Sequence, residues 1–475
     1  MNKVNGRRVL VIGLDGVSPK LLFERWPERV PNIRKLMEQG IYGRHDSIIP
    51  PTTIMAWSAF ASGMHPGQLG VYAYMIRESF DSFERRLADS TLCKKEFIWD
   101  ILGGKGANST VLHVPLTFPV RPIKGAMVSG FLAPELNEES VHPKELLGRV
   151  KERFGDKYLF DIAGLAGYKN FDPETLIKKT YEMAGMQFSL AEELLKKQDW
   201  AFFMHVDIGT DRLHHMLWRY FDDGHVNYEP GTKYANALAD YYSFVDGKIG
   251  GLVRHADDDT VIIIASDHGM DRMDGKINVN EWLIKEGYLK LKEGLYESLD
   301  GPTKFSYDMI DWEKTKAFSQ GNYQARIFFN RKERDPGHGI LIEEEFLSLR
   351  EELTGKLRKI TDPKGKKLNT FVYTPEEIYG EDYEKRDCPD LLIMFDDLVW
   401  GTSDEIGTRQ LYSWDTIVGK NDAGHAREGF FIISGKPVKR RGDVGKTDFL
   451  NFFPTIMKVF GLEDNVKNGE PIKLD

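Results

Sequence analysis

Apolar runs that end in a carboxylate constrain the fold of this chain more than any other feature. The stretch VIIIASDHGM, residues 261–270, starts with four β-branched residues and then reaches Asp267, followed by a histidine. The run at residues 8–14 is followed at once by Asp15, and the run at residues 200–207 ends in an aspartate. Continuous apolar runs of this length are typical of strands that are buried on both faces of a parallel sheet.

Helical patterns alternate with these runs. Further strands are expected at residues 41–49, 109–116, 125–131, 389–397 and 428–435, and helices at residues 31–38, 53–63, 173–197, 210–221, 232–255 and 448–462. This alternation predicts an α/β fold, with a mostly parallel sheet and helices on both faces. Ligands of such sheets bind outside the carboxyl ends of the strands, where Asp15, Asp207 and Asp267 all fall.

Two stretches follow the alternation less well. Residues 65–190 are largely rich in proline, glycine and aromatic residues, and residues 285–400 mix short strands with a charged helix at 342–360. We expect one catalytic domain spanning residues 1–475. The two stretches are then insertions that form a cap over the site.

Composition excludes several classes of protein. The 475 residues carry a formal charge of −9 without a long basic run, which argues against nucleic-acid polymers but not against an anionic substrate. Cys93 and Cys388 are the only cysteines, too few for a disulfide framework or a thiolate zinc site. The apolar start is broken by Gly13 and Asp15, and no apolar stretch has transmembrane length. We therefore expect a cytoplasmic protein with no membrane association.

Aspartates and histidines gather at the ends of the predicted elements. Asp211 and His215 are four residues apart, so a helix places them on one face, where both can reach one ion. Asp207 and His214 compete for these roles, although Asp207 can also cap the helix and His214 points about a quarter turn away. The candidate ligands are Asp15, Asp211, His215, Asp267, His268 and His425. Three carboxylates and three imidazoles suit two divalent ions with three protein ligands each.

Each candidate has an ordinary structural explanation when it is taken alone. An aspartate before a glycine is a common turn residue, and a single histidine in a loop or on a helix is more often structural. The whole set is harder to explain in this way, because all six lie at strand or helix ends. The remaining histidines are assigned to the core or the surface, with His65 and His205 expected nearest to the site.

A nucleophile for phosphoryl transfer is offered by IIPPTTIMAWSAFASG, residues 48–63. Pro50 and Pro51 end a strand, and Thr52 or Thr53 begins a helix. A hydroxyl at that position lies at the positive end of the helix dipole, and the backbone N–H groups there bind phosphate oxygens. N-capping is the commoner use of such threonines, so the catalytic interpretation depends on the metal candidates around them.

Several segments together resemble the alkaline phosphatase superfamily, and most closely its type I phosphodiesterase/nucleotide pyrophosphatase family. They are VIGLDG, PPTTIMAWSAFASGMHPG, DRLHHMLW, SDHGM and GHAREGFFIISG, and the closing TDFLNFFPTIMKVFGL is similar to the family's last helix. The segments span nearly the whole chain in the family's order. The resemblance implies an alkaline-phosphatase-like fold and a metal-dependent phosphohydrolase that cleaves phosphodiester or pyrophosphate bonds in nucleotide-like substrates.

The resemblance also implies roles for individual residues. It divides the candidates into two ligand sets, Asp15, Asp267 and His268 for one ion, and Asp211, His215 and His425 for the other. Thr53 takes the position of the nucleophile, bridges toward the metals and forms a phosphothreonine, whereas Thr52 is the less favoured choice. Zinc suits these ligands, with manganese or iron as alternatives.

Two positions depart from the family's pattern. Ala56 stands where many nucleotide pyrophosphatases carry an asparagine that contacts a phosphate oxygen, and Leu69 replaces the histidine of the family's P-x-x-H-G. A phosphomonoesterase or phosphomutase of the same superfamily, similar to cofactor-independent phosphoglycerate mutase, is one alternative, because those enzymes resemble this core. A non-catalytic metal-bound binding protein is another, whereas the Cys-x-Pro-x-Arg run of sulfatases is absent around residues 50–60.

Overall fold

The computed structural model describes residues 3–80, 84–163, 167–335, 337–414, 421–466 and 468–475. The chain divides into two compact units. Unit 1 comprises Met1–Val71, Ala88–Met270 and His425–Asp475, and unit 2 comprises Tyr72–Leu87 and Asp271–Gly424.

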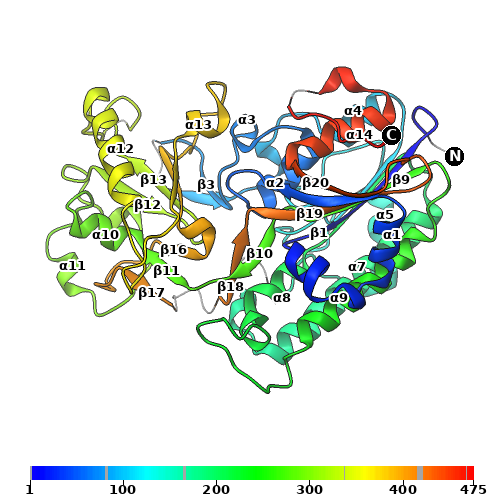
Figure 1. The fold of residues 1–475 in the computed structure, drawn as a ribbon. Coiled ribbons are helices and arrows are strands. Elements are labelled where there is room, and N and C mark those ends of the chain that lie inside the picture. The colour runs from blue at the N-terminus through cyan, green and yellow to red at the C-terminus, as the bar shows by residue number, and fades with distance from the viewer. Residues whose placement is uncertain (1–2, 81–83, 164–166, 336, 415–420, 467) are drawn as a thin grey trace. The chain divides into compact units, whose positions relative to one another are not determined.

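Among the described residues, nine strands form the central sheet of unit 1 (Figure 1). In spatial order they are β20 (Gly442–Asp448), β2 (Ile41–Asp46), β19 (Glu428–Ser434), β9 (Thr260–Ala265), β1 (Arg8–Leu14), β8 (Phe202–Asp207), β5 (Ser109–Leu112), β6 (Gly125–Val128) and β7 (Val141–His142). β1 pairs in parallel with β8 and β9, and β5 pairs in parallel with β8 and β6, whereas β19 is antiparallel to both its neighbours. The mostly parallel sheet predicted from the sequence is confirmed.

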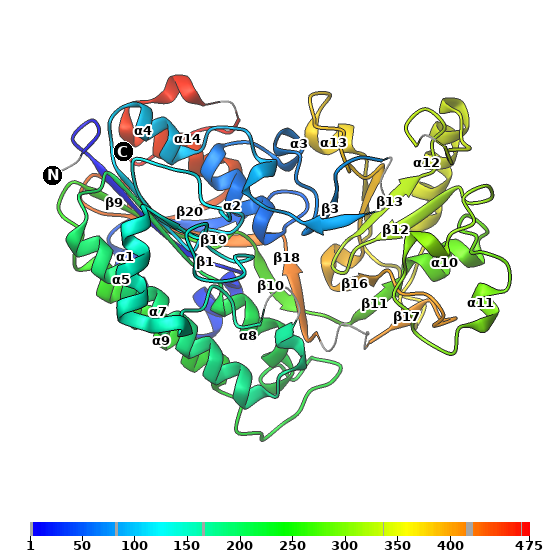
Figure 2. The same cartoon turned by 180° about the vertical axis from the view of Figure 1, so that it is seen from behind.

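Helices cover both faces of this sheet (Figures 1 and 2). One face carries α1 (Pro31–Glu38), α5 (Lys144–Phe154), α7 (Pro173–Lys197) and α9 (Ala237–Val253), with α8 (Gly209–Leu217) beside α7 and α9. The other face carries α2 (Thr53–Ser62), α4 (Ile98–Gly104) and α14 (Phe452–Phe460), and the short α3 (Pro66–Leu69) follows α2. None of the described helices is long and apolar enough to cross a membrane.

Local sequence signals account for some of the element ends. The side chain of Asp172 caps α7 by accepting a hydrogen bond from the backbone N–H of Thr175, and α7 then begins with a proline. Several predicted elements are shorter than expected, among them one helix and one strand. The helix expected from residue 232 begins at Ala237, and β5 ends at Leu112 because His113 adopts a left-handed φ of 60°, which interrupts an extended strand.

Unit 2 is built on an antiparallel sheet in the order β12 (Ala317–Gln320), β13 (Ala325–Phe329), β15 (Leu391–Met394) and β14 (Phe371–Tyr373). A second sheet has the order β16 (Trp400–Ser403), β11 (Gly275–Asn278) and β17 (Tyr412–Ser413), and β3 (Met75–Arg77) pairs with β4 (Arg85–Leu87). The helices of the unit are α10 (Val279–Lys285), α11 (Leu295–Ser298), α12 (Glu343–Leu357) and α13 (Pro375–Tyr379). Phe346 and Leu353 of α12 join Phe329 of β13 in its core.

The two stretches expected to be insertions behave differently. Residues 285–400 lie within unit 2. Residues 65–190 lie mainly in unit 1, where they supply β5, β6 and β7 to the central sheet, and only Tyr72–Leu87 belongs to unit 2. That the two stretches form a cap over the site stays a prediction.

Gly13 on β1 provides a test of how tightly α2 packs on the sheet. A Cβ atom at this position would lie 2.4 Å from Cη2 of Trp57 and 2.9 Å from Cγ2 of Val206. Gly13→Ala is therefore expected to lower the free energy of unfolding by about 1–3 kcal/mol, because the core has no room for the methyl group. Thermal or urea unfolding measures the change.

Gly148→Ala on α5 is the matched control. Gly148 is exposed, and a Cβ atom there would meet no atom within 4 Å. The same substitution is expected to stabilise the protein by about 0.5–1 kcal/mol, because alanine loses less backbone freedom than glycine on entering a helix. Effects of the same sign at both positions would contradict the packing described here.

Candidate functional site

The predicted ligands are brought together at the carboxyl ends of three neighbouring strands of unit 1. Asp15 directly follows β1, and its backbone N–H donates to the carbonyl of Asp207 at the end of β8, 2.9 Å away. Asp267 and His268 follow β9. Asp211 and His215 lie on α8, and His425 lies on β18 (Ala423–Ala426), which pairs with β10 (Gly269–Arg272). All six side chains are buried.

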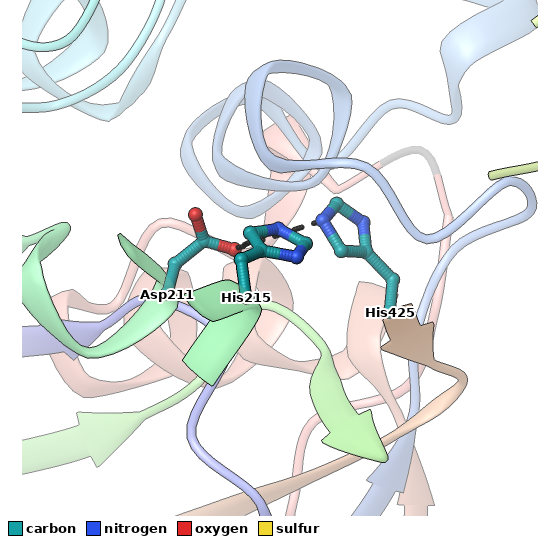
Figure 3. Close-up of side chains that lie close together, drawn as sticks. All are labelled: Asp211, His215 and His425. Carbon is teal, nitrogen blue, oxygen red and sulfur yellow. Dashed lines mark ion pairs between the residues drawn. The ribbon is translucent and has the colours of Figure 1, made fainter. Parts of the chain in front are cut away.

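Asp211, His215 and His425 form one group, which we call the α8 triplet (Figure 3). Oδ1 of Asp211 lies 3.2 Å from Nε2 of His215 and 3.6 Å from Nε2 of His425. The first contact joins residues four apart on one helix, as the sequence predicted. Their ligand atoms lie within 4.8 Å of one another, close enough to bind a single ion.

Asp15, Asp267 and His268 form the second group, which we call the β1–β9 triplet. Nε2 of His268 lies 3.3 Å from Oδ2 of Asp267 and 3.7 Å from Oδ1 of Asp15. The rings of His268 and His425 stack with centroids 3.8 Å apart, so the two triplets are adjacent. The structure thus divides the six residues into the two sets that the family resemblance implied.

In each carboxylate, one oxygen binds a protein donor and the other faces the triplet. Oδ2 of Asp15 accepts from Nε1 of Trp57 at 2.9 Å, and Oδ2 of Asp211 accepts from Nη1 of Arg212 at 2.7 Å. Oδ1 of Asp267 accepts from the backbone N–H of Gly16 at 3.1 Å. Gly16 has a left-handed φ of 66°, which a glycine adopts without strain.

The carboxylate oxygens that face the triplets mark a candidate cation site. Among the described residues, Oδ1 of Asp211 and Oδ2 of Asp267 are buried and have no hydrogen-bond donor. Nδ1 of His425 lies 2.7 Å from the carbonyl of Pro51, and Nδ1 of His268 lies 2.9 Å from that of Gly269. A carbonyl only accepts hydrogen bonds, so these contacts assign the proton to Nδ1 and leave the Nε2 lone pair facing the carboxylates. Carboxylate oxygens and imidazole lone pairs, which are all acceptors, thus face one another in a buried site. A metal ion would satisfy both kinds of acceptor.

The pKa values describe the electrostatic cost of this arrangement without ions. Burial and the neighbouring carboxylates raise the pKa of Asp15 well above its ordinary range, and burial does the same for Asp267. Burial lowers the pKa of His425 well below its ordinary value, which keeps the ring neutral. Burial alone would also raise the pKa of Asp211, but His215 and Arg212 hold it well below the usual range.

Thr53 places its hydroxyl against the β1–β9 triplet. It is the first residue of α2, and its Oγ1 lies 3.3 Å from Oδ1 of Asp15 and 3.5 Å from Nε2 of His268. Thr52 is the N-cap residue, with extended backbone and no side-chain cap hydrogen bond. The geometry therefore favours Thr53 over Thr52 as the group next to a bound phosphate.

The competing candidates lie outside both triplets. Asp207 accepts hydrogen bonds from the hydroxyl of Tyr241, and burial raises the pKa of Asp207 to about 6. His214 contacts the hydroxyl of Tyr242 at 3.0 Å, and burial lowers the pKa of His214 to about 3. Both residues have structural partners instead of a place in a ligand set.

The histidines expected nearest to the site are also structural. His65 caps α3 through a contact between its Nδ1 and the backbone N–H of Gln68. His205 pairs with His113 in the core, with their Nδ1 atoms 3.0 Å apart. Conversely, the sequence did not identify Trp57 and Arg212 as donors to the ligand carboxylates.

Comparisons with known proteins identify the family and the fold. Residues 9–429 match the family model described as type I phosphodiesterase/nucleotide pyrophosphatase. Human ectonucleotide pyrophosphatase/phosphodiesterase 5 has a similar fold, with a TM-score of 0.55, 14% identity, and coverage of 98% of this chain and 97% of its own. The murine protein gives a TM-score of 0.54 at 14% identity over 98% of both chains.

A further murine structure is an inactive threonine-to-alanine variant in complex with AMP, with a TM-score of 0.54, 14% identity, and coverage of 98% of this chain and 97% of its own. No curated protein matches the sequence significantly. Because the family model extends over most of its length, the chain belongs to the type I phosphodiesterase/nucleotide pyrophosphatase family, and it is a hydrolase of that family.

Proposed function

We propose that the protein hydrolyses phosphodiester or pyrophosphate bonds of small nucleotide-like molecules through a phosphothreonine on Thr53, with two divalent ions bound by the triplets. The observation that carries this proposal is the contact of Thr53 Oγ1 with a carboxylate and an imidazole of the β1–β9 triplet. N-capping does not account for the Thr53 hydroxyl, because Thr52 is the N-cap residue of α2.

The two triplets suit zinc in particular. Each offers three oxygen or nitrogen ligands, and a catalytic zinc site keeps a position open for substrate beside three protein ligands. Manganese and iron also accept this mixture of carboxylate and imidazole, so the metal assignment is the first point to measure.

The proposed reaction has two displacements at phosphorus. In the first, Thr53 Oγ1 forms a bond to phosphorus, the bond to the leaving oxygen breaks, and the hydroxyl proton ends on the released group. In the second, a water oxygen attacks the phosphothreonine, the Oγ1–phosphorus bond breaks, and Thr53 regains its proton. When bound, the ions supply the Lewis acidity that lowers the pKa of the hydroxyl and neutralises the phosphate.

The residues of this chain prepare the first displacement. Oδ1 of Asp15 is placed to orient the Thr53 hydroxyl, and Trp57 fixes the other oxygen of that carboxylate. The N-terminus of α2 lies at Thr53, where a helix can offer backbone N–H groups to a bound anion. Ala56 supplies no polar group here, so the backbone takes on more of the binding of phosphate oxygens than in relatives with asparagine.

The substrate class rests on the family and on the AMP complex of the murine neighbour. A phosphomonoesterase or phosphomutase would use the same metal centre, and a binding protein would hold the ions without turnover. The three possibilities predict different substrates. The proposed enzyme consumes a phosphodiester or pyrophosphate, a phosphatase or mutase consumes a phosphomonoester, and a binding protein consumes neither.

A substrate panel separates these possibilities. If the protein is a diesterase, metal-loaded protein is expected to hydrolyse bis-p-nitrophenyl phosphate faster than p-nitrophenyl phosphate. Both substrates release the same leaving group, so the comparison isolates the effect of the second ester. Release of p-nitrophenol is followed by absorbance. Turnover of the monoester alone would favour a phosphatase or mutase, and no turnover of either ester would favour a binding protein.

Removal of metal is expected to abolish turnover and lower stability. Dialysis against a chelator leaves the carboxylates of Asp15, Asp211 and Asp267 without cations, and zinc at 100 times its dissociation constant should restore about 2.7 kcal/mol per site. Activity and unfolding are measured on the same samples, with metal content from elemental analysis. Full activity in protein shown to be free of metal would refute the metal-dependent mechanism.

Thr53→Ala is expected to lower diester turnover by at least about 10³-fold, because the nucleophile is lost, while both ions still bind. Thr53→Ser keeps the hydroxyl and should retain a substantial part of the activity, and Thr52→Ala is the neighbouring control with little effect. Mass spectrometry of acid-quenched wild-type protein should find phosphate on the peptide that carries Thr53. Near-full activity of Thr53→Ala would exclude the covalent route.

A further inference from the structure

Arg212 is a buried guanidinium group placed directly behind the α8 triplet. Only 4% of the residue is exposed. Its Nε and Nη2 donate to Oδ1 and Oδ2 of Asp161 at 2.9 and 3.1 Å, which makes a two-point ion pair. The guanidinium carbon also lies 4.5 Å from the ring centroid of Phe131 and 4.7 Å from that of Tyr168. These contacts fix the plane of the guanidinium group.

The remaining edge of the guanidinium group holds the metal-ligand carboxylate. Nη1 of Arg212 donates to Oδ2 of Asp211 at 2.7 Å, and Oδ1 of Asp211 is the oxygen that faces His215 and His425. Neighbouring residues on a helix ordinarily point in different directions, so this contact depends on the anchorage of Arg212 by Asp161. The carboxylate is thereby prevented from turning and presents a single oxygen.

Asp161 also balances the charge. An unpaired guanidinium group this close to the triplet would repel a divalent cation, whereas the pair with Asp161 is neutral as a unit. Burial would lower the pKa of Arg212, but the carboxylates of Asp161 and Asp211 keep it above its ordinary value, so the group stays charged. A lysine could supply charge at this place but not the three-point fork.

We infer that Arg212, held by Asp161, is a positioning residue that tunes the metal affinity of the α8 triplet and leaves the β1–β9 triplet unaffected. This inference rests on the proposed function, because it assumes that the triplets bind ions. Donors behind a metal ligand typically change metal affinity by about 10- to 100-fold when they are removed. The two triplets within one chain provide an internal comparison.

The test measures zinc affinity at each triplet separately, by competition with a chromophoric chelator. Asp267→Asn weakens the β1–β9 triplet and leaves the α8 triplet intact, and His215→Ala does the reverse. In the Asp267→Asn background, Arg212→Lys should raise the zinc dissociation constant about 10- to 100-fold. In the His215→Ala background, the same change should alter it by less than about threefold, because Arg212 contacts the ligand residues through Asp211, which belongs to the weakened α8 triplet.

Two further variants keep the test independent of folding. Asp161→Asn retains the guanidinium group but removes half of its anchor, and should weaken the α8 triplet in the same direction. Arg8→Lys is the matched control. Arg8 is also buried, pairs with Asp199 and Asp257, and lies over the ring of Trp200, but it is at the opposite end of β1. Its replacement should leave both zinc affinities unchanged.

The outcomes distinguish this inference from the proposed function. Wild-type protein that binds fewer than two zinc ions would contradict the proposed function itself. The wild type could bind two ions while Arg212→Lys and Asp161→Asn leave the zinc affinity of the α8 triplet unchanged. That result would overturn the positioning role of Arg212 but not the proposed function. Equal losses at both triplets would show that Arg212 acts through general stability and would also overturn it.

Discussion

The burial of three carboxylates at one edge of a sheet is the constraint on which this structure depends. Asp15, Asp211 and Asp267 are shielded from water, and in each of them one oxygen accepts from Trp57, Arg212 or Gly16 while the other faces a triplet. An isolated buried carboxylate is expensive, and three within one site repel one another as well. The ring of His425, which burial keeps neutral, does not relieve this cost. The two divalent cations that we propose would relieve it, and the proposed catalysis would then use charge that the fold already needs.

The sheet makes this assembly possible by bringing distant segments together. Strands β8, β1 and β9 are adjacent and parallel, so their carboxyl ends deliver Asp15 and Asp267 to one edge, next to the start of α8. Thr53 arrives from the opposite layer at the first turn of α2, and Trp57 on the next turn ties that helix to Asp15. The proposed nucleophile and the β1–β9 triplet are therefore positioned by the same contact.

The sequence predicted features that depend on local pattern, and it missed those that depend on distant pairing. β1, α1 and α7 have the predicted ends, because apolar runs and cap residues mark them. The ligands could be found because carboxyl ends of parallel strands converge. The strand order of unit 2 depends on non-local pairing, and Arg212 gave no signal, because its role needs Asp161, 51 residues away.

The most direct test of the central claim is the position of bound metal. Crystals grown with zinc and measured on both sides of its absorption edge should show two anomalous peaks. One peak should lie among Asp211, His215 and His425, and the other among Asp15, Asp267 and His268, with Thr53 Oγ1 beside them. A single peak, or peaks outside these side chains in zinc-saturated crystals, would contradict the assignment of a two-metal centre to this edge of the sheet.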